Sequence, residues 1–455
     1  MCGIAGYFGP RSLSDKVISS TLDLMYNRGP DSKNFYKLNI RDKSLYLFHS
    51  RLKIIDLSRV LGGPSCTQIL GDHGADVIKV EALSGEQGRA MFTLSGIDRS
   101  LPGGRNSYFE ANQRNKRSIA LDLKQPEGVD VVRNLVGGAD IFLQNYRKGV
   151  AERLGLGYED LKAVNNKIIY GSGSGYGPEG PDAHKPALDT VGQARSGLMY
   201  ATGPDGDDPY PIQGVVADQI GGIMLSWGIL AALYAREDTG VGQRVDASHL
   251  GSSIWLQGLG VSMSMLTAHK PASETNLTAK PSRDKAYNPI SNYYRCKDGR
   301  WLMLANLEAD RYWPTFAAAL GIEELAIDEK FIDTASRAKN NQQLIKLLDA
   351  VFESKTYDEW DEILSSSGDF IYAPVQQLME LWDDPQVQAN KYIVETDHPT
   401  LGKVKLANHP IKYSETPSSI RRLAPEIGEH TEEILIEAGY SWDDIADLQD
   451  KGVIL

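Results

Sequence analysis

The sequence predicts an α/β protein in which a parallel-sheet domain is followed by a second, smaller α+β domain. From residue 52 onward, short apolar runs alternate with amphipathic segments, which is typical of parallel α/β units. After about residue 250 this pattern ends, and residues 268–292 are rich in Pro, Ser, Asn and Lys, as linkers are. Beyond them, Tyr293–Cys296 and Trp301–Ala305 flank a short turn, which indicates a β-hairpin.

The candidate strands of the first domain are residues 52–57, 75–81, 119–123, 141–145 and 167–170. After the first of them a Gly-Gly-Pro-Ser turn follows, and Ser65 is expected to cap a helix that ends near Gly71. A proline that a first helical turn tolerates opens a predicted helix over residues 126–136. A long helix is predicted from Gly214 to about Glu237, because the Thr-Gly pair that follows is a normal helix end.

The composition is that of an ordinary soluble globular protein, with 41% hydrophobic and 24% charged residues among 455. The net charge of −12 argues against nonspecific binding to nucleic acid, although a local basic cluster can still bind a small polyanion. Only three cysteines occur, Cys2, Cys66 and Cys296, too few and too scattered for a disulfide framework or a metal cage. The longest apolar run, Ile220–Ala235, is shorter than the ~20 residues of a membrane span, so a buried helix is expected there. Without a secretory signal after Met1, a cytoplasmic protein that binds no membrane is expected.

The first residues carry a separate pattern. Removal of Met1 would make Cys2 N-terminal, and its own α-amino group could then act as the base. Together with Arg28–Asp31 and His49–Leu52, this start resembles the class II glutamine amidotransferase domain of asparagine synthetases, which implies that Cys2 is a nucleophile and that Arg51 holds the glutamine carboxylate. The resemblance stops at residue 58, and the family's oxyanion and amine-binding segments do not follow. Residues 1–51 are therefore interpreted as a truncated extension, because the largest contribution to acyl-transfer catalysis is missing.

Ordered sequence blocks run through the rest of the chain, at residues 56–64, 74–81, 115–124, 145–149, 153–155, 217–219 and 239–243. They resemble the family III CoA-transferases, a group that includes formyl-CoA and carnitine CoA-transferases and the α-methylacyl-CoA racemases. The resemblance implies a Rossmann-like large domain over residues 52–248, a linker over 249–283, a small domain over 284–402 and a C-terminal segment, 403–455, that returns to the large domain. It also implies an interlocked homodimer.

The resemblance further implies that coenzyme A is a substrate and that no cofactor is tightly bound. Two groups of basic residues beside predicted strand ends are candidates to bind its phosphates. They are Arg114, Lys116, Arg117 and Lys124, and Arg147, Lys148 and Arg153. By the same resemblance the nucleotide is expected to contact Val60, Gly62, Leu121, Lys124, Asn145, Tyr146, Arg153 and Leu154. Ala82 stands where formyl-CoA transferases have an arginine.

Asp218 is the expected nucleophile. The matching aspartate of the family attacks the acyl-CoA thioester, forms a mixed anhydride and then an aspartyl-CoA thioester, and passes CoA to an acceptor acid. A carboxylate suits this role because it is ionised at neutral pH. Asp189 is expected to support it, by orienting groups or managing a proton. The racemases have a histidine at the position of Leu188, so the loss of one base favours transfer over racemisation.

Two other enzyme classes remain as alternatives, an acyl-CoA racemase and a glutamine amidotransferase. A non-catalytic CoA-binding protein is a third and more distant alternative. No glycine run of the formyl-CoA transferase type occurs between residues 250 and 300, so oxalate specificity is not supported, and succinyl-CoA is a plausible donor by family resemblance alone. The glycine pattern at 175–180 is not followed by a helix start, which argues against NAD. The histidines His73, His184 and His249 lack metal-ligand spacing, and solvent-facing or structural roles are expected for them.

Overall fold

The computed structural model describes residues 2–9, 13–14, 16–18, 33–40, 43–203, 208–270 and 282–455, and for the strands within residues 2–51 it describes the backbone alone. The chain divides into two compact units. The first contains residues 1–199, 211–266 and 392–455, and the second contains residues 200–210 and 267–391. The chain thus leaves the first unit and returns to it. The return begins at Tyr392, upstream of the expected position 403.

The first unit contains a six-stranded sheet in which every neighbouring pair is parallel. In chain order its strands are β4 (Lys53–Asp56), β5 (Asp76–Glu81), β10 (Lys116–Ala120), β11 (Ile141–Gln144), β12 (Ile169–Ser174) and β13 (Arg244–Ser248). Their spatial order is β10-β5-β4-β11-β12-β13, which is the 3-2-1-4-5-6 order of the doubly wound Rossmann fold. The predicted α/β class is confirmed. The order reverses between β4 and β11, and ligands of such sheets bind at the carboxyl side of this switch point.

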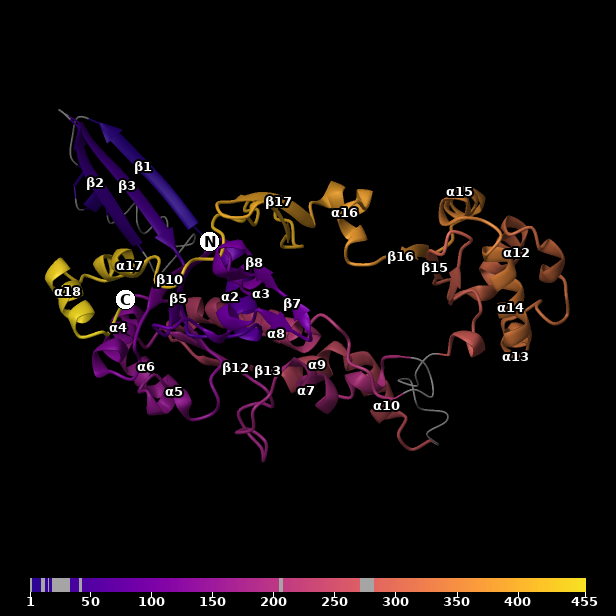
Figure 1. The fold of residues 1–455 in the computed structure, drawn as a ribbon, viewed down its shortest axis with the longest axis horizontal. Helices are drawn as coiled ribbons and strands as arrows, with labels where there is room; N and C mark the ends of the chain where they lie inside the picture. The colour runs from indigo at the N-terminus through magenta and orange to yellow at the C-terminus, as the bar shows by residue number, and fades with distance from the viewer. Residues whose placement is uncertain are drawn as a thin grey trace. The chain divides into compact units, whose positions relative to one another are not determined.

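Apolar side chains cover both faces of the sheet, which is why its strands are hydrophobic in neighbouring positions and not only in alternate ones. Ile54 and Ile55 illustrate this, because one belongs to the core beneath α2 (Gly62–Asp72) and α8 (Val216–Thr239), and the other to the core on the opposite face. The helices of that opposite core are α4 (Pro126–Gly137), α6 (Tyr158–Val164), α17 (Thr431–Glu437) and α18 (Trp442–Asp450). The yellow helices α17 and α18 come from the end of the chain (Figure 1).

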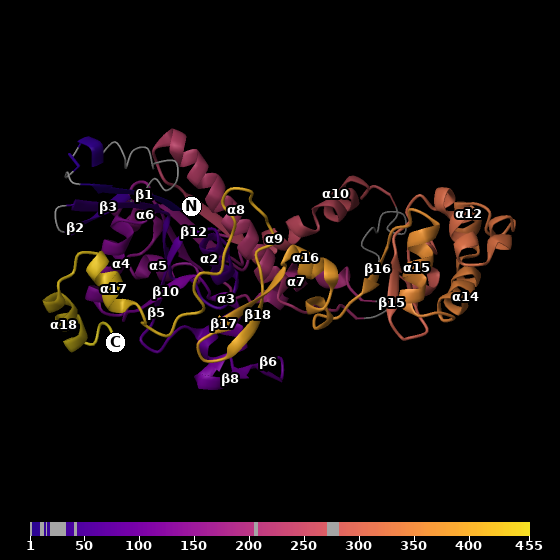
Figure 2. The same cartoon turned by 90° about the horizontal axis from the view of Figure 1, so that it is seen from above.

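The long helix α8 is only half buried, which corrects the expectation of a buried helix. Leu225, Ile229 and Ala232 pack against the sheet, whereas Trp227 and Tyr234 are exposed on the other side. By length and composition alone α8 could cross a membrane, with a mean hydropathy of 1.5 over its most apolar stretch, of which 44% is buried inside the protein. It runs along the first unit and ends at Thr239, where Gly240 follows with a φ of 68° that closes the helix (Figure 2).

Several expected boundaries were wrong. Ser65 does not cap α2, because the helix begins at Gly62 after Leu61, and the Ser65 hydroxyl donates to the Gly62 carbonyl within the first turn. The strand expected over residues 119–123 lies earlier, at Lys116–Ala120, because Lys116 and Arg117 find partners inside the protein. The polar edge strand β13 was not predicted at all.

The two ends of the chain attach differently to this unit. Leu52 alone separates β4 from an antiparallel sheet of β1 (Cys2–Gly9), β2 (Lys33–Ile40) and β3 (Lys43–Arg51). The expectations for Cys2 and Arg51 concern side chains that are not described, and residues 28–31 lie outside the described residues. At the other end, the amide of Asp122 donates to the carbonyl of Val453 at 2.8 Å, beside the edge strand β10. This hydrogen bond attaches the end of the chain to the first unit, to which residues 392–455 belong.

The second unit has its own core. Its three-stranded sheet contains the predicted hairpin, formed by β14 (Tyr293–Arg295) and β15 (Trp301–Leu304), and the strand β16 (Tyr372–Val375). Its principal helices are α12 (Ala309–Ala319), α13 (Thr334–Lys339), α14 (Asn341–Phe352) and α15 (Tyr357–Ser367). Aromatic side chains, including Trp313, Phe316 and Trp360, fill the space between them.

A buried ion pair lies at the carboxyl end of β4. Asp56 and Lys116 have no exposed surface, and their Oδ2 and Nζ atoms are 3.1 Å apart. Asp56 also accepts hydrogen bonds from the Ser58 amide and the Thr67 hydroxyl. Burial alone would raise the pKa of Asp56, but Lys116 and Lys79 outweigh it and lower the pKa below its usual range.

Lys116→Met is expected to lower the free energy of unfolding by about 3–5 kcal/mol, because it leaves the buried Asp56 carboxylate without its cation. Denaturant unfolding of the purified chain measures this loss. Lys124→Met is the matched control, since Lys124 is exposed in the same segment, and a change of no more than about 0.5 kcal/mol is expected for it. Equal stability of the two variants would contradict a structural role for the pair.

Candidate active site

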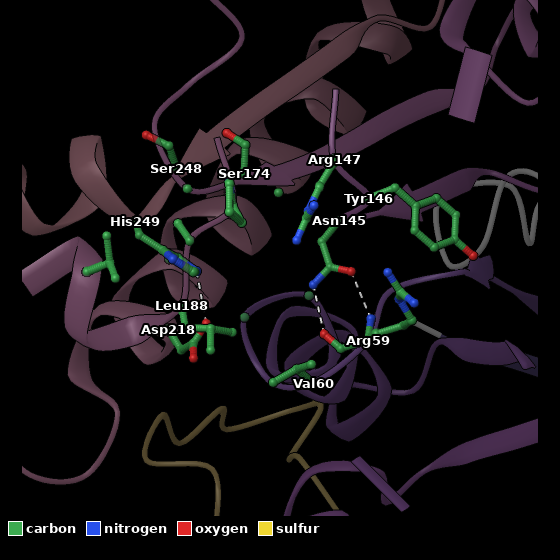
Figure 3. Close-up of a pocket in the computed structure, with 18 of the residues that line it drawn as sticks. Arg59, Val60, Asn145, Tyr146, Arg147, Ser174, Leu188, Asp218, Ser248 and His249 are labelled. Carbon is green, nitrogen blue, oxygen red and sulfur yellow. Dashed lines mark hydrogen bonds and ion pairs between the residues drawn. The ribbon is translucent and has the colours of Figure 1, made fainter. Parts of the chain in front are cut away.

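A cavity of about 520 Å³ opens at the carboxyl ends of β4, β11, β12 and β13, which is the switch point of the sheet. Its lining includes the loop after β4, the loop after β11, the glycine-rich end of β12 and the start of α9 (His249–Leu256). Asp218, in the first turn of α8, faces this cavity (Figure 3). The structure therefore brings the expected nucleophile and part of the expected nucleotide site together.

The loop after β4 is held from two sides. The Asn145 side-chain amide donates to the Arg59 carbonyl at 2.8 Å and accepts from the Arg59 amide at 2.8 Å (Figure 3). The residue that follows β11 thus binds the main chain of this loop twice. On the other side Glu86 accepts from the Val60 amide at 3.1 Å. Val60 has a φ of 68°, which is strained for a β-branched residue, and surrounding contacts must maintain such a conformation.

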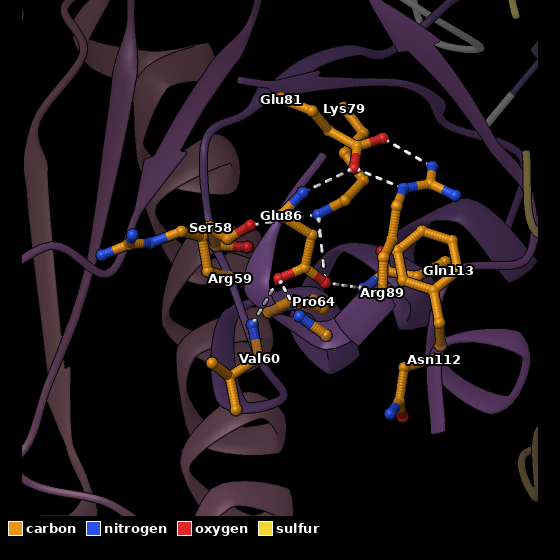
Figure 4. Close-up of polar contacts among 12 residues, drawn as sticks. Ser58, Arg59, Val60, Pro64, Lys79, Glu81, Glu86, Arg89, Asn112 and Gln113 are labelled. Carbon is orange, nitrogen blue, oxygen red and sulfur yellow. Dashed lines mark hydrogen bonds and ion pairs between the residues drawn. The ribbon is translucent and has the colours of Figure 1, made fainter. Parts of the chain in front are cut away.

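Beneath this loop lies a buried polar cluster (Figure 4). Lys79 donates to the Ser58 carbonyl at 3.1 Å, and Arg89 binds both carboxylate oxygens of Glu81 at 2.7 Å. Burial would raise the pKa of Glu81, but Arg89 and Lys79 lower it, so its carboxylate stays charged. The cluster supports the strained conformation of Val60, because it binds the Ser58 carbonyl and the Val60 amide and so fixes the backbone that leads into that residue.

Asp189 holds the first turn of α8. The residue before that helix, Val215, has a φ of 54° and gives no side-chain cap. Instead the Oδ1 atom of Asp189, from α7 (Asp189–Arg195), accepts from the amides of Ala217 at 2.6 Å and Asp218 at 3.1 Å. Gln193 donates to its Oδ2 at 2.6 Å. Of the two roles expected for Asp189, these contacts support orientation, because it binds the backbone and not the carboxylate of Asp218.

His249 was expected to face solvent or to be structural, and the site corrects this expectation. Its Nε2 atom lies 2.9 Å from Oδ1 of Asp218 (Figure 3). His249 directly follows β13, so the missed strand concealed that the histidine lies at the carboxyl edge of the sheet. Tyr108 was also missed. Burial and the negative charge of Asp218 raise the pKa of this tyrosine, so its phenol stays protonated near the site.

The two basic groups have different environments. Arg114 binds Asp72, Lys116 binds Asp56, and Arg117 binds Asp76, so the charge of the first group is neutralised inside the protein. That group was wrongly assigned to phosphate, apart from the exposed Lys124. The cationic residues that line the cavity are Arg59, Arg147, Lys148 and Lys185. Arg59 lies 5.0 Å from the centre of the Tyr146 ring.

The expected nucleotide contacts fall into two sets. Val60, Gly62, Asn145 and Tyr146 line the cavity. Leu121, Lys124, Arg153 and Leu154 are outside its lining. Leu121 is fully buried, and Tyr146 and Leu154 pack against the same core as Leu121. Lys124 and Arg153 are exposed at the surface.

The sequence was compared with models of known protein families, and two of them match. The model of CoA-transferase family III matches residues 50–431, so the chain belongs to this family. A second family model, of a glutamine amidotransferase domain, matches residues 1–68.

Relatives of similar length support the same assignment. The chain is 34% identical to an acyl-CoA transferase of Fusarium pseudograminearum, over 89% of this chain and 87% of the relative. It is 32% identical to the human succinyl-CoA:glutarate CoA-transferase, over 89% of each chain. A solved structure of a CAIB/BAIF family protein from Brucella suis is 29% identical and covers 85% of this chain and 98% of its own, with a TM-score of 0.73. The protein is a CoA-transferase.

Asp189→Ala is expected to remove about 1 kcal/mol of stability, the usual effect of losing a helix cap, and to lower kcat at least about tenfold, because Asp218 then sits on an unrestrained turn. Asp189→Asn keeps an oxygen that can accept from the same amides, so this variant should retain most of the stability and most of kcat. Thermal unfolding and steady-state CoA transfer measure the two effects. An Asn variant as impaired as the Ala variant would contradict the capping role and favour proton transfer.

Proposed function

We propose that the protein moves coenzyme A from an acyl-CoA to a free carboxylic acid through covalent intermediates on Asp218. The observation that supports this most directly is the position of the Asp218 carboxylate. It faces the switch-point cavity, with its backbone held by Asp189 and one oxygen held by His249. A nucleophile fixed in this way needs little reorganisation before attack.

In the proposed reaction, an Asp218 oxygen attacks the thioester carbonyl and CoA leaves as a thiolate, which gives a mixed anhydride. The thiolate then attacks Cγ of Asp218, and the donor acid leaves as a carboxylate. The acceptor carboxylate attacks the resulting aspartyl-CoA thioester, again at Cγ, and expels the thiolate. Attack of the thiolate on the acyl carbon of the second anhydride releases the new acyl-CoA and the Asp218 carboxylate. No net proton is transferred in this sequence.

The cavity suits both ends of such a substrate. Arg59 and Arg147 at its rim can bind diphosphate and 3′-phosphate groups, for which arginine is well shaped. The lining also contains the apolar side chains of Leu188, Val191 and Leu225, of which the first two are exposed, so a bound acyl group that covers them would shield the anhydride from water. We place the nucleotide at the cationic rim and the acyl group near Asp218. Because the named relatives include transferases of succinyl-CoA, formyl-CoA and cinnamoyl-CoA, a panel of donors is needed to identify the substrate.

We propose transfer in preference to racemisation. Leu188 offers no base, whereas His249 supplies a histidine near Asp218 from another element. Two bases that exchange an α-proton must flank the carbon from opposite sides. His249 and Asp218 are hydrogen-bonded to each other, so this pair is arranged to act on one carboxylate and not across a carbon atom.

Asp218→Ala is expected to abolish transfer from succinyl-, formyl- and cinnamoyl-CoA to a panel of free acids, because no nucleophile remains. Product acyl-CoAs are measured by liquid chromatography. Asp238→Ala is the matched control, since Asp238 is exposed at the other end of α8, and it should leave the rates unchanged. Unchanged transfer by Asp218→Ala would contradict the mechanism. Deuterium uptake from D₂O at the α-carbon of a 2-methylacyl-CoA, without transfer, would indicate the isomerase instead.

We also propose that the protein is a cytoplasmic homodimer. Ile223, Trp227, Leu230 and Tyr234 form an exposed apolar stripe along α8 that a second copy would cover. Light scattering is expected to give twice the mass of the chain, and Trp227→Glu to weaken the assembly by placing a charge in its centre. Glu237→Ala, at an exposed position of the same helix, is the control. A monomeric wild type would contradict the proposal.

A further inference from the structure

His249 makes a selective contact with the nucleophile. Its Nε2 atom is 2.9 Å from Oδ1 of Asp218, and the described residues make no hydrogen bond to the other oxygen, Oδ2. The two side chains are only 16% and 9% exposed. A carboxylate only accepts hydrogen bonds, so the proton between them lies on Nε2. The two oxygens of Asp218 are thus distinguished, with Oδ1 bound and Oδ2 open for attack.

Glycines in the neighbouring helices leave space for the imidazole ring of His249. A methyl group at Gly192 of α7 would lie 2.7 Å from Cβ of His249. One at Gly62 of α2 would lie 3.1 Å from Oδ1 of Asp218 and 3.4 Å from Nε2 of His249. A methyl group at Gly221 of α8 would lie 3.4 Å from Cδ2 of the ring. Three helices therefore carry glycine where the histidine and the aspartate meet.

The other ring nitrogen of His249, Nδ1, is not the one that contacts Asp218. The Nδ1 atom of His249 is shielded from solvent and has no hydrogen-bond partner among the described residues. Buried polar atoms usually have a partner, and exceptions concentrate at functional sites. The ring is therefore held by packing in its slot and by its single hydrogen bond to Asp218.

We propose that His249 is the oxyanion donor for the steps that occur at Cγ of Asp218. This inference rests on the proposed aspartyl mechanism. In the anhydride, Oδ2 carries the acyl group and Oδ1 becomes a carbonyl oxygen. When the CoA thiolate attacks Cγ, the C–S bond forms, negative charge develops on Oδ1, and the Cγ–Oδ2 bond then breaks to release the donor acid. Nε2–H of His249 already points at Oδ1 and stabilises that charge.

The same donor serves the later attack of the acceptor acid on the aspartyl-CoA thioester, because that step also places charge on Oδ1. It does not serve the first step, in which the charge develops on the oxygen of the acyl group. His249 should therefore accelerate the steps at Cγ and affect attack on the acyl carbon much less. A residue that merely oriented Asp218 would affect all of these steps alike.

The test measures the rate at which each of two covalent adducts of Asp218 forms, the acyl anhydride and the CoA thioester. Wild type is mixed with succinyl-CoA, or with the most active donor of the panel, quenched in acid at successive times, and analysed by intact mass for an acyl adduct and a CoA adduct. In His249→Leu the acyl adduct is expected to form within about tenfold of the wild-type rate, whereas the CoA adduct should appear about 10²–10³-fold more slowly. His249→Gln keeps an N–H donor and should recover part of that loss. His269→Leu, at an exposed histidine, is the control.

If His249→Leu does not fold, Gly62→Ala, whose methyl group lies beside the same hydrogen bond, is expected to show the same selective delay. Equal slowing of both adducts, or no slowing of the CoA adduct, would overturn the assignment of His249. Failure of the underlying mechanism is seen separately, as wild type without either adduct or as an adduct that persists in Asp218→Ala.

Discussion

The site depends on the buried carboxylate of Asp56 at the end of β4. This one group accepts hydrogen bonds from the Ser58 amide, the Thr67 hydroxyl and the Lys116 ammonium. It therefore connects the first strand with α2 and with β10, which lies two strands away in the sheet. Such a buried charge is tolerated only where its partners are complete. The loop that leaves β4 towards the cavity consequently starts from a fixed point, and Asn145 and Glu86 fix it further along.

Side chains from three helices position the reactive carboxylate of Asp218. Asp189 comes from α7, Asp218 from α8 and His249 from α9, and their contacts form a set that none of these helices could provide alone. Close approach requires small residues between the helices, and Gly62 and Gly192 supply them. The strain at Val60 and Val215 belongs to the same arrangement, since both residues adopt left-handed backbone conformations next to the site.

The sequence predicted the sheet, the long helix and the two aspartates because these depend on local patterns or on ordered blocks of residues. It could not show which charges are free. Arg114 and Arg117 look like an anion site, yet Arg117 is paired partly with Glu433 and Glu437, more than 300 positions away. His249 was missed for a related reason: β13 is a polar edge strand with no apolar pattern, so its end could not be located. Pairing partners and strand ends are properties of the folded chain.

The junction near residue 52 follows from the position of β4 within the sheet. β4 is paired on both sides, to β5 and β11, so no upstream strand is needed to complete the sheet. Only Leu52 separates its amino end from β3, whereas its carboxyl end leads into the loop that lines the cavity. An apolar strand that ends in Asp-Leu-Ser can terminate the glutaminase-like pattern and open the transferase pattern at once. Every described contact of Asp56 and every described residue of the cavity lining comes from β4 onward, so in the described part of the chain the transferase site does not use the upstream segment.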